Sequence, residues 1–299
     1  MKKRKPYIAL LFSILTPGLG HIYCGRPLKG LLLFGCTVVY FPLAWLIEMA
    51  GARGTSFYIA FMAVLLFSAL AMLYAIGDAF FLAKRKREEM RAGPFNRSWV
   101  YILIILAGLT TSWAFPLNIK SNLVQAFRIP SSAMTPSVLI DDYLFADKAL
   151  YKKRLPRYGE IVVFIYPEDR QKYFIKRVIG LPGDRIEVRG DEVIVNGHPL
   201  AHVLKTQATF NGAKGPIKGA VVEETLADRT YSILLTKSKQ SNKHMGPFIV
   251  PANHCFVLGD NRNNSLDSRH FGPVPLVDVL ARADFIYLPA GKWSRFGKI

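Results

Sequence analysis

The chain has 299 residues, of which 51% are hydrophobic, and a formal net charge of +18. Its length allows two domains of ordinary size, and its apolar content excludes a disordered protein. The positive charge suits either a nucleic acid or an anionic membrane surface as partner. Residues 1–119 carry 13 Lys or Arg against 4 Asp or Glu, and nearly all of them lie between long apolar runs. Because this is the pattern of a membrane protein, a lipid bilayer is the expected partner and a nucleic acid is not.

The first 119 residues contain four long stretches without a charged side chain. They are residues 6–25, 30–47, 54–77 and 98–119. About 20 apolar residues cross a bilayer as a helix, so the last three stretches are predicted to be transmembrane helices. The first stretch contains Pro17 and Gly18–Gly20, which interrupt a helix. Residues 1–119 are therefore predicted to form an α-helical membrane domain.

The basic residues predict the orientation of this domain. Six of them follow the third stretch: Lys84, Arg85, Lys86, Arg87, Arg91 and Arg97. Because short loops rich in Lys and Arg stay in the cytoplasm, the chain after residue 120 is expected outside the cytoplasmic membrane. The same rule places Arg26, Lys29 and the basic residues 2–5 inside. We therefore expect a re-entrant or interfacial first stretch and three crossings, with four crossings as the alternative. No small-x-small cleavage site follows the first stretch, which is expected to be retained.

Residues 120–299 are predicted to form a mainly-β domain outside the membrane. Short β-rich runs are separated by turn signals such as Pro182–Asp184 and Asn196–Gly197, as in all-β domains. The runs are Tyr143–Ala146, Ile161–Tyr166, Tyr173–Ile179, Arg185–Val188, Glu192–Val195, Tyr231–Leu235, Pro247–Val250, His254–Leu258 and Ala283–Leu288. Residues 203–246 are more polar and contain several glycines, and we interpret them as an insertion in this domain or a mobile flank of its core.

The cysteines and histidines do not predict a metal or a cofactor. Cys24, Cys36 and Cys255 form no CxxC pair, and no His/Cys cluster has the spacing of metal ligands. The histidines of the second part lack a partner pattern and are interpreted as surface or packing residues: His198, His202, His244, His254 and His270.

Three segments carry candidate chemistry: FRIPSSAMTPS at 127–137, YFIKRVIGLPGD at 173–184 and GDNRNNSLDSR at 259–269. Taken singly, each has an ordinary explanation: a turn, a lysine whose stem covers apolar surface, and a loop of ion pairs. A lysine buried in a strand would have a lowered pKa and could act as a general base near neutral pH. Lys176 and Arg177 both have apolar neighbours, so the two-residue period of a strand does not choose between them.

Together, in this order behind a membrane domain, the three segments resemble type I signal peptidase (leader peptidase) over residues 120–290. The resemblance implies a membrane-anchored serine endopeptidase with a Ser–Lys dyad, which removes signal peptides from exported preproteins at the outer face of the cytoplasmic membrane. It implies that Lys176 is the general base, that Ser131 contributes its hydroxyl to the oxyanion hole, and that Ser265 orients the lysine. The implied supporting residues are Met134 and Pro136 beside the nucleophile, Asp260, Asn261 and Arg262 in the loop after Gly259, and the structural pair Asp267 and Arg269.

One position departs from the family pattern in a way that affects activity. The family's nucleophile is the serine directly before the methionine, and here that residue is Ala133. Because a methyl group cannot attack a carbonyl, activity of this chain is in doubt. Three explanations stay open: an engineered Ser→Ala replacement, a natural member that has lost activity, or Ser132 as a substitute nucleophile. The last requires a backbone shift, because neighbouring residues of an extended chain point to opposite faces. A smaller departure is Asn263, where the family commonly has Asp.

The resemblance also implies a mechanism and partners. Neutral Lys176 would take a proton from a hydroxyl at position 133, and the backbone N–H of residue 133 with Ser131 would hold the oxyanion; no cofactor or metal is needed. The implied substrates are preprotein signal peptides with small residues at the first and third positions before the cut, bound as an added strand. Five apolar residues near the site are expected to dip into the bilayer surface: Phe127, Ile129, Met134, Val138 and Leu139.

Other function classes fit the sequence less well. A catalytically inactive pseudopeptidase that captures signal peptides is the main alternative, and Ala133 is its motivation. An autoproteolytic regulator of the SOS-repressor type shares the Ser–Lys dyad, but the membrane spans and the missing helix-turn-helix pattern oppose it. A nucleic-acid-binding protein is suggested only by the charge of +18.

Overall fold

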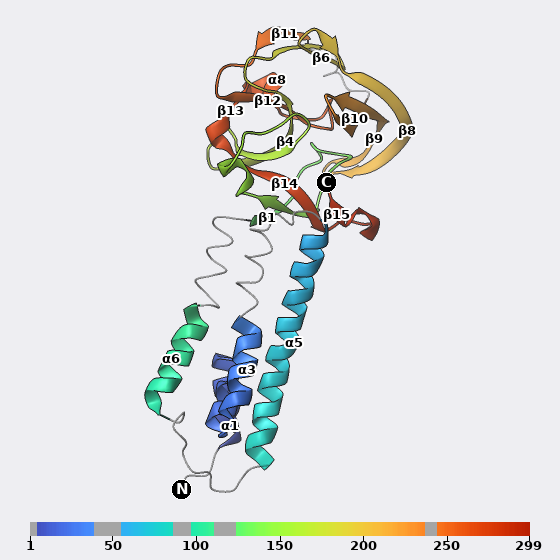
Figure 1. Cartoon of the computed structure of the whole chain (residues 1–299). Helices are drawn as coiled ribbons and strands as arrows, with labels where there is room; N and C mark the ends of the chain where they lie inside the picture. The colour runs from blue at the N-terminus through green and yellow to red at the C-terminus, as the bar shows by residue number, and fades with distance from the viewer. Residues whose placement is uncertain (1–4, 39–54, 86–96, 111–123, 237–243) are drawn as a thin grey trace. The chain divides into compact units, whose positions relative to one another are not determined.

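The computed structural model describes residues 5–38, 55–85, 97–110, 124–236 and 244–299. The chain divides into two compact units, residues 1–121 and 122–299, which are described separately (Figure 1). The boundary predicted between residues 119 and 120 lies beside this division.

The first unit is helical, and its first apolar stretch folds back on itself. Helix α1 (Pro6–Leu15) ends before Pro17, and α2 (Leu19–Tyr23) runs back along it. The backbone N–H of Lys5 donates a hydrogen bond of 3.2 Å to the Tyr23 hydroxyl, so the two ends of this hairpin meet. The turn needs glycine, because Gly18 has φ +88° and a Cβ there would lie 2.0 Å from the carbonyl oxygen of Gly30. The other helices are α3 (Pro27–Val38), α5 (Thr55–Arg85) and α6 (Ser98–Leu109).

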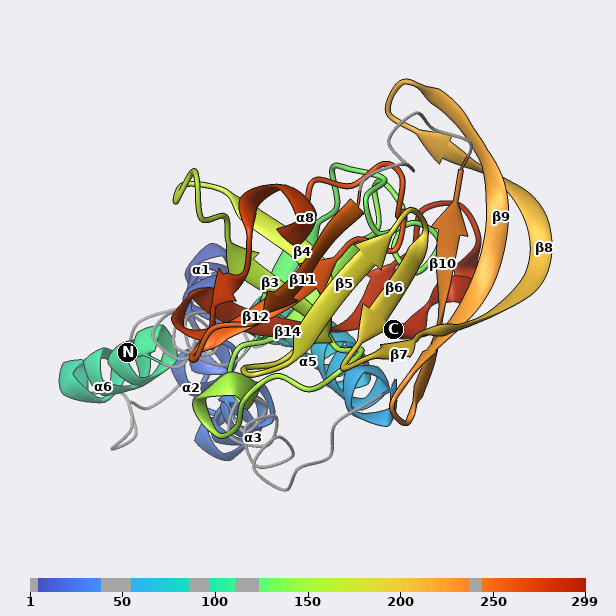
Figure 2. The same ribbon diagram turned by 90° about the horizontal axis from the view of Figure 1, so that it is seen from above.

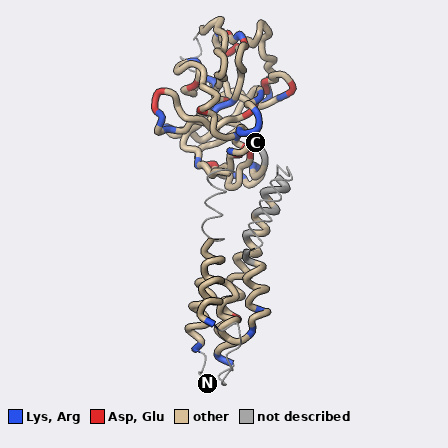
Figure 3. The backbone as a smooth tube through the Cα atoms, turned by 60° about the vertical axis from the view of Figure 1, so that its left-hand side comes forward, with Lys and Arg blue, Asp and Glu red and all other residues tan. Residues whose placement is uncertain are grey.

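Within the described ranges, one helix is long and apolar enough to cross a membrane. It is the 24-residue part of α5 from Met62 to Arg85. The predicted crossings 30–47 and 98–119 begin in α3 and α6, which have 12 residues each, and their remaining parts lie outside the described residues. The number of crossings therefore stays a prediction. The described Lys and Arg residues of this unit lie toward the end at which α1 begins (Figure 3).

The second unit is mainly β, as predicted, and every described pairing of its named strands is antiparallel. The largest sheet has the order β1-β2-β14-β3-β4-β12-β13, with β15 paired to β14. Its strands are β1 (Val124–Arg128), β2 (Tyr143–Asp147), β3 (Ile161–Ile165), β4 (Tyr173–Gly180), β12 (His254–Leu258), β13 (Val274–Pro275), β14 (Val279–Leu288) and β15 (Gly297–Lys298). The nine runs predicted from the sequence all fall on strands of this unit.

Two smaller sheets complete the unit, in the orders β10-β9-β8 and β11-β5-β6-β7. Their strands are β5 (Arg185–Arg189), β6 (Glu192–Val195), β7 (His198–Pro199), β8 (Ala201–Gly212), β9 (Gly215–Leu226), β10 (Arg229–Leu235) and β11 (His244–Ile249). Figure 2 shows β8 and β9 as a long curved ribbon at the edge of the unit. The region interpreted as an insertion is thus largely regular structure. Sequence reasoning missed β8 and β9 because most of β8 is exposed on both faces and lacks an apolar alternation.

The expectation that apolar residues near the site enter the bilayer is wrong for three of the five. Ile129, Met134 and Val138 are at most 3% exposed and pack in one core cluster with residues of β2, β3 and β14. The segment between β1 and β2 winds in turns, which aim these side chains inward against the sheet. Phe127 and Leu139 are half-buried.

Candidate active site

Lys176 is a buried lysine on the central strand β4. It pairs in register with Val162 of β3, and its side chain is only 4% exposed. Its Nζ donates a hydrogen bond of 3.0 Å to the carbonyl of Ile175 and lies 5.3 Å from the centre of the Phe174 ring. Burial lowers the pKa of Lys176 to about 8, against the opposing charges of Asp267 and Asp260. A substantial fraction of this amine is therefore neutral near neutral pH.

Arg177, the next residue, is committed to structure. Its guanidinium donates two hydrogen bonds to Asp260, of 2.6 and 2.7 Å, and one of 2.7 Å to the carbonyl of Gly159. It also stacks 4.1 Å from the centre of the Tyr231 ring. Lys176 has no carboxylate within ion-pair distance among the described residues. The structure therefore distinguishes the two residues that strand periodicity left equal: Lys176 is buried without an ion pair among the described residues, and Arg177 holds the loop that begins at Gly259.

That loop also holds the segment around Ala133. The backbone N–H of Asn261 donates to the carbonyl of Ala133 (3.1 Å), and its side-chain Nδ2 donates to the carbonyl of Ser132 (3.1 Å). Asn264 Nδ2 reaches the Ser132 hydroxyl at 3.4 Å. Both backbone carbonyls thus point into the loop, which fixes the orientation of the peptide units at residues 132 and 133.

Gly259 is where the loop and this segment come closest. A Cβ at this position would lie 2.6 Å from the Ala133 carbonyl oxygen and 2.1 Å from the Ser265 hydroxyl. The Ser265 hydroxyl is buried and has no hydrogen-bond partner in the described part of the chain. The hydrogen bond from Ser265 that would orient Lys176 is therefore absent from this structure.

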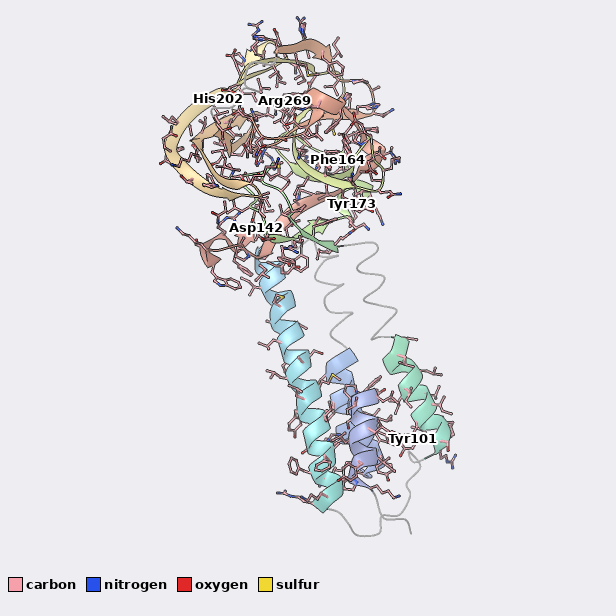
Figure 4. The ribbon with its side chains drawn as sticks, turned by 180° about the vertical axis from the view of Figure 1, so that it is seen from behind. Tyr101, Asp142, Phe164, Tyr173, His202 and Arg269 are labelled. Atoms are coloured by element: carbon pink, nitrogen blue, oxygen red, sulfur yellow. The ribbon has the colours of Figure 1, made fainter. Side chains whose placement is uncertain are left out.

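Asp267 and Arg269 (the latter labelled in Figure 4) form an ion pair, as the resemblance implies. Asp267 begins the short helix α8 (Ser268–Phe271), accepts a hydrogen bond of 3.0 Å from the backbone N–H of Gly259, and pairs with Arg269 at 2.8 Å. Arg269 also donates to the carbonyl of Arg262 (2.6 Å). Burial would raise the pKa of Asp267, but the hydrogen bond and charge of Arg269 outweigh it and lower the pKa.

Arg262 is tied to a residue that sequence reasoning missed. Its guanidinium pairs with Glu224 of β9, and both side chains are at most 2% exposed. Glu224 also accepts hydrogen bonds from the Tyr231 hydroxyl (2.7 Å) and from His202 (2.9 Å). Burial raises the pKa of Glu224, but the charge of Arg262 and these hydrogen bonds lower it to about 2. His202 (Figure 4) therefore has a partner, which its place in the sequence did not suggest, because Glu224 lies 22 residues away.

A groove of about 600 Å³ brings the central residues together. Its lining includes Ser131, Ser132, Ala133 and Lys176, with further residues of β4 and the tip of the β8–β9 hairpin. Ser131 is exposed, whereas Ser132 and Ala133 are 8% and 9% exposed. The other predicted site residues are not part of this lining: Met134, Pro136, Asp260, Asn261, Arg262, Ser265, Asp267 and Arg269. Within the described ranges, no group of three or more His, Cys, Asp or Glu is placed to hold a metal ion.

Comparisons with known proteins place this arrangement in a family. The family model described as "Signal peptidase, peptidase S26" matches residues 96–288. The chain is 32% identical over 204 residues to a signal peptidase I of Leptolyngbya laminosa, covering 64% of this chain and 84% of the relative. It is 33% identical over 211 residues to a probable signal peptidase I-2 of Synechocystis, covering 69% and 80%. A solved signal peptidase I from Enterococcus faecalis V583 is 26% identical, with 43% of this chain and 97% of that chain covered and a TM-score of 0.27.

Proposed function

Because the chain belongs to the signal peptidase family, peptidase S26, we propose that Lys176 is the general base of its site and that residue 133 occupies the nucleophile position. By family the chain is a signal peptidase I, a serine endopeptidase. The observation that carries the proposal is a buried lysine without a carboxylate partner, with a pKa of about 8, in the same groove as Ala133. At pH 7 about one tenth of such an amine is neutral and able to accept a proton.

The donors for a tetrahedral intermediate are also present in the groove. Ser131 is exposed and lines it. The Ser132 carbonyl, which belongs to the same peptide unit as the N–H of residue 133, accepts a hydrogen bond from Asn261 Nδ2, so this N–H has a defined direction. A well-placed oxyanion donor contributes about 3–4 kcal/mol to catalysis. Ser265 orients Lys176 once the amine leaves the carbonyl of Ile175 and turns toward the buried, unpartnered hydroxyl.

With Ala133 in place, the site binds a signal peptide but lacks the hydroxyl that attacks it. Loss of a serine nucleophile lowers turnover by about a million-fold in a serine protease of another fold. With Ala133, the chain is therefore a pseudopeptidase that binds signal peptides without cleaving them. Ser132 is a second candidate nucleophile, because it lines the same groove as Lys176 and the hydrogen bond that its hydroxyl accepts from Asn264 Nδ2 is long, at 3.4 Å.

The proposed substrate class follows the family: preprotein signal peptides with small residues at the first and third positions before the cut. The chain then lies in the cytoplasmic membrane as a multi-pass protein, with residues 120–299 on the outer face. The α1–α2 hairpin supports a re-entrant first stretch and three crossings. Helix α1 has 10 residues and is about 15 Å long, which is half the thickness of the hydrocarbon core. Lys5, the residue before α1, is hydrogen-bonded to Tyr23 at the end of α2. Labelling of single cysteines at residues 4, 50, 92 and 120 from either side of the membrane tests this topology.

The decisive experiment is cleavage of a preprotein with an Ala-x-Ala site by the purified chain in detergent. It compares the chain as written with Ala133→Ser, and uses the double variant Ala133→Ser/Lys176→Ala as the inactive control. Cleavage by the Ala133→Ser variant alone supports the proposed roles. Cleavage by the chain as written, lost on Ser132→Ala, assigns the nucleophile to Ser132 instead. If Ala133→Ser binds the preprotein but never cuts it, the proposed dyad is wrong.

A further inference from the structure

The groove has a third wall that none of the sequence motifs contains. Residues 212–217, at the tip of the β8–β9 hairpin, line it together with Ser131–Ala133 and Tyr173–Lys176. The tip lies outside all three motifs and is 28 residues from the nearest of them in the chain, so only the fold brings it there. A peptide bound in this groove therefore meets the hairpin tip as well as the residues of the dyad.

The hairpin is built to carry its tip away from the rest of its sheet. Within the described residues, the pairing of β10 with β9 ends at Ala220, whereas β8 and β9 continue to the pair Gly212–Gly215. In the part of the chain that the structure describes, residues 208–219 thus form a two-stranded arm, closed by the turn Ala213–Lys214. The base is held by the buried pair of Glu224 with Arg262. Because a two-stranded ribbon adds little stability by itself, the arm's contribution lies in what its tip presents to the groove.

What the tip presents is a positive charge. The basic residues of the groove lining are Lys176 and Lys214, and no Asp or Glu lines it among the described residues. Lys214 has no ion-pair partner within the described part of the chain, so its ammonium is available to a ligand. Burial lowers the pKa of Lys176 to about 8, and that lysine loses charge as the pH rises toward 9. A groove lined by cations without a matching acid attracts carboxylates.

We propose that Lys214 makes the groove selective for peptides that carry an Asp or Glu side chain within a few residues of the peptide bond placed at residue 133. This rests on the proposed function, because it requires a peptide in the groove. Lys214 is a specificity residue in this proposal: it contacts a side chain of the peptide and takes no part in proton transfer or attack.

Direct binding tests the proposal, because the chain as written is expected to hold peptides without consuming them. The probes are fluorescent peptides with an Ala-x-Ala site, made in pairs that have Glu or Gln at one position, for each position on both sides of the cut. Fluorescence anisotropy measures their affinity for the full chain in detergent at low salt. At one or more positions Glu binds about three- to fivefold tighter than Gln, as for an exposed charge pair. Lys214→Gln removes this preference and Lys214→Glu inverts it. Lys218→Gln, on the same arm but outside the groove lining, leaves it unchanged.

The outcomes separate this proposal from the one on which it rests. Equal binding of Glu and Gln peptides at every position overturns the role of Lys214 and leaves signal-peptide binding intact. A Glu preference that survives Lys214→Gln also overturns it. If no peptide binds, the proposed function fails and this inference fails with it. The preference should shrink in 0.5 M salt, where the screening length is only a few ångströms.

Discussion

Replacement of Lys176 by methionine should stabilise the second unit, because the buried ammonium is held there at a free-energy cost. Burial lowers the pKa of Lys176 from 10.5 to about 8. A difference of 2.5 units corresponds to about 3.4 kcal/mol between the charged and neutral amine. Methionine has a similar shape and no charge, so Lys176→Met should raise the free energy of unfolding at pH 7 by up to about 3 kcal/mol.

The stabilisation expected from Lys176→Met depends on pH, and a surface lysine serves as the control. Because the folded pKa is the lower one, the unfolded chain binds more protons between pH 8 and 10.5, and stability of the unsubstituted chain rises with pH in that window. The penalty is about 3.4 kcal/mol at pH 7 and about 1 kcal/mol at pH 10. The advantage of Lys176→Met should therefore shrink by about 2 kcal/mol over this range. Lys172→Met, at an exposed lysine paired with Asp169, should show neither effect.

Hydrogen exchange in urea, read at the amides of β4 and β12 in the full chain in detergent, measures this stability without interference from the helical unit. A Lys176→Met variant that is less stable than the parent at pH 7 would contradict the reasoning. So would an advantage of the same size at pH 7 and pH 10. Either result would mean that the amine is solvated in the folded protein and is a poor candidate for a general base.

Three further predictions address the site and its support. Glu224→Ala leaves Arg262 charged and unpaired in the interior, so it should lower the free energy of unfolding by about 3–5 kcal/mol, as measured by urea denaturation. An effect below about 1 kcal/mol would show that water reaches the guanidinium. Gly259→Ala places a Cβ 2.6 Å from the Ala133 carbonyl oxygen, so it should displace the segment around Ala133 and weaken signal-peptide binding at least tenfold in an anisotropy titration. Unchanged affinity would show that the loop does not position the segment around Ala133. In the Ala133→Ser variant, kcat/KM should rise about tenfold from pH 7 to 9, because the fraction of neutral Lys176 rises by that factor around its pKa of about 8. A further tenfold rise above pH 9 would indicate that the lysine is not buried.

Local patterns in the sequence were sufficient to predict many of the strands and to name the residues of the candidate site. Runs such as Glu192–Val195 and His254–Leu258 were predicted with their observed bounds, because alternation and turn residues act over a few positions. The motifs likewise placed Ser131, Ala133 and Lys176 in one site, and the structure brings all three into one groove. Strand β8 escaped prediction because most of its residues are exposed, so no buried face imposes an apolar alternation.

Contacts between distant segments were decided only by the tertiary structure. Asp260 pairs with Arg177, so that Lys176 has no ion-pair partner among the described residues. Glu224 pairs with Arg262, and Met134 is buried in the core of the β unit. The physical reason is that neighbouring residues share the same local pattern. Whether a side chain is buried, paired or exposed depends on the register of strands far apart in the chain, and the charge state of the lysine follows from that burial.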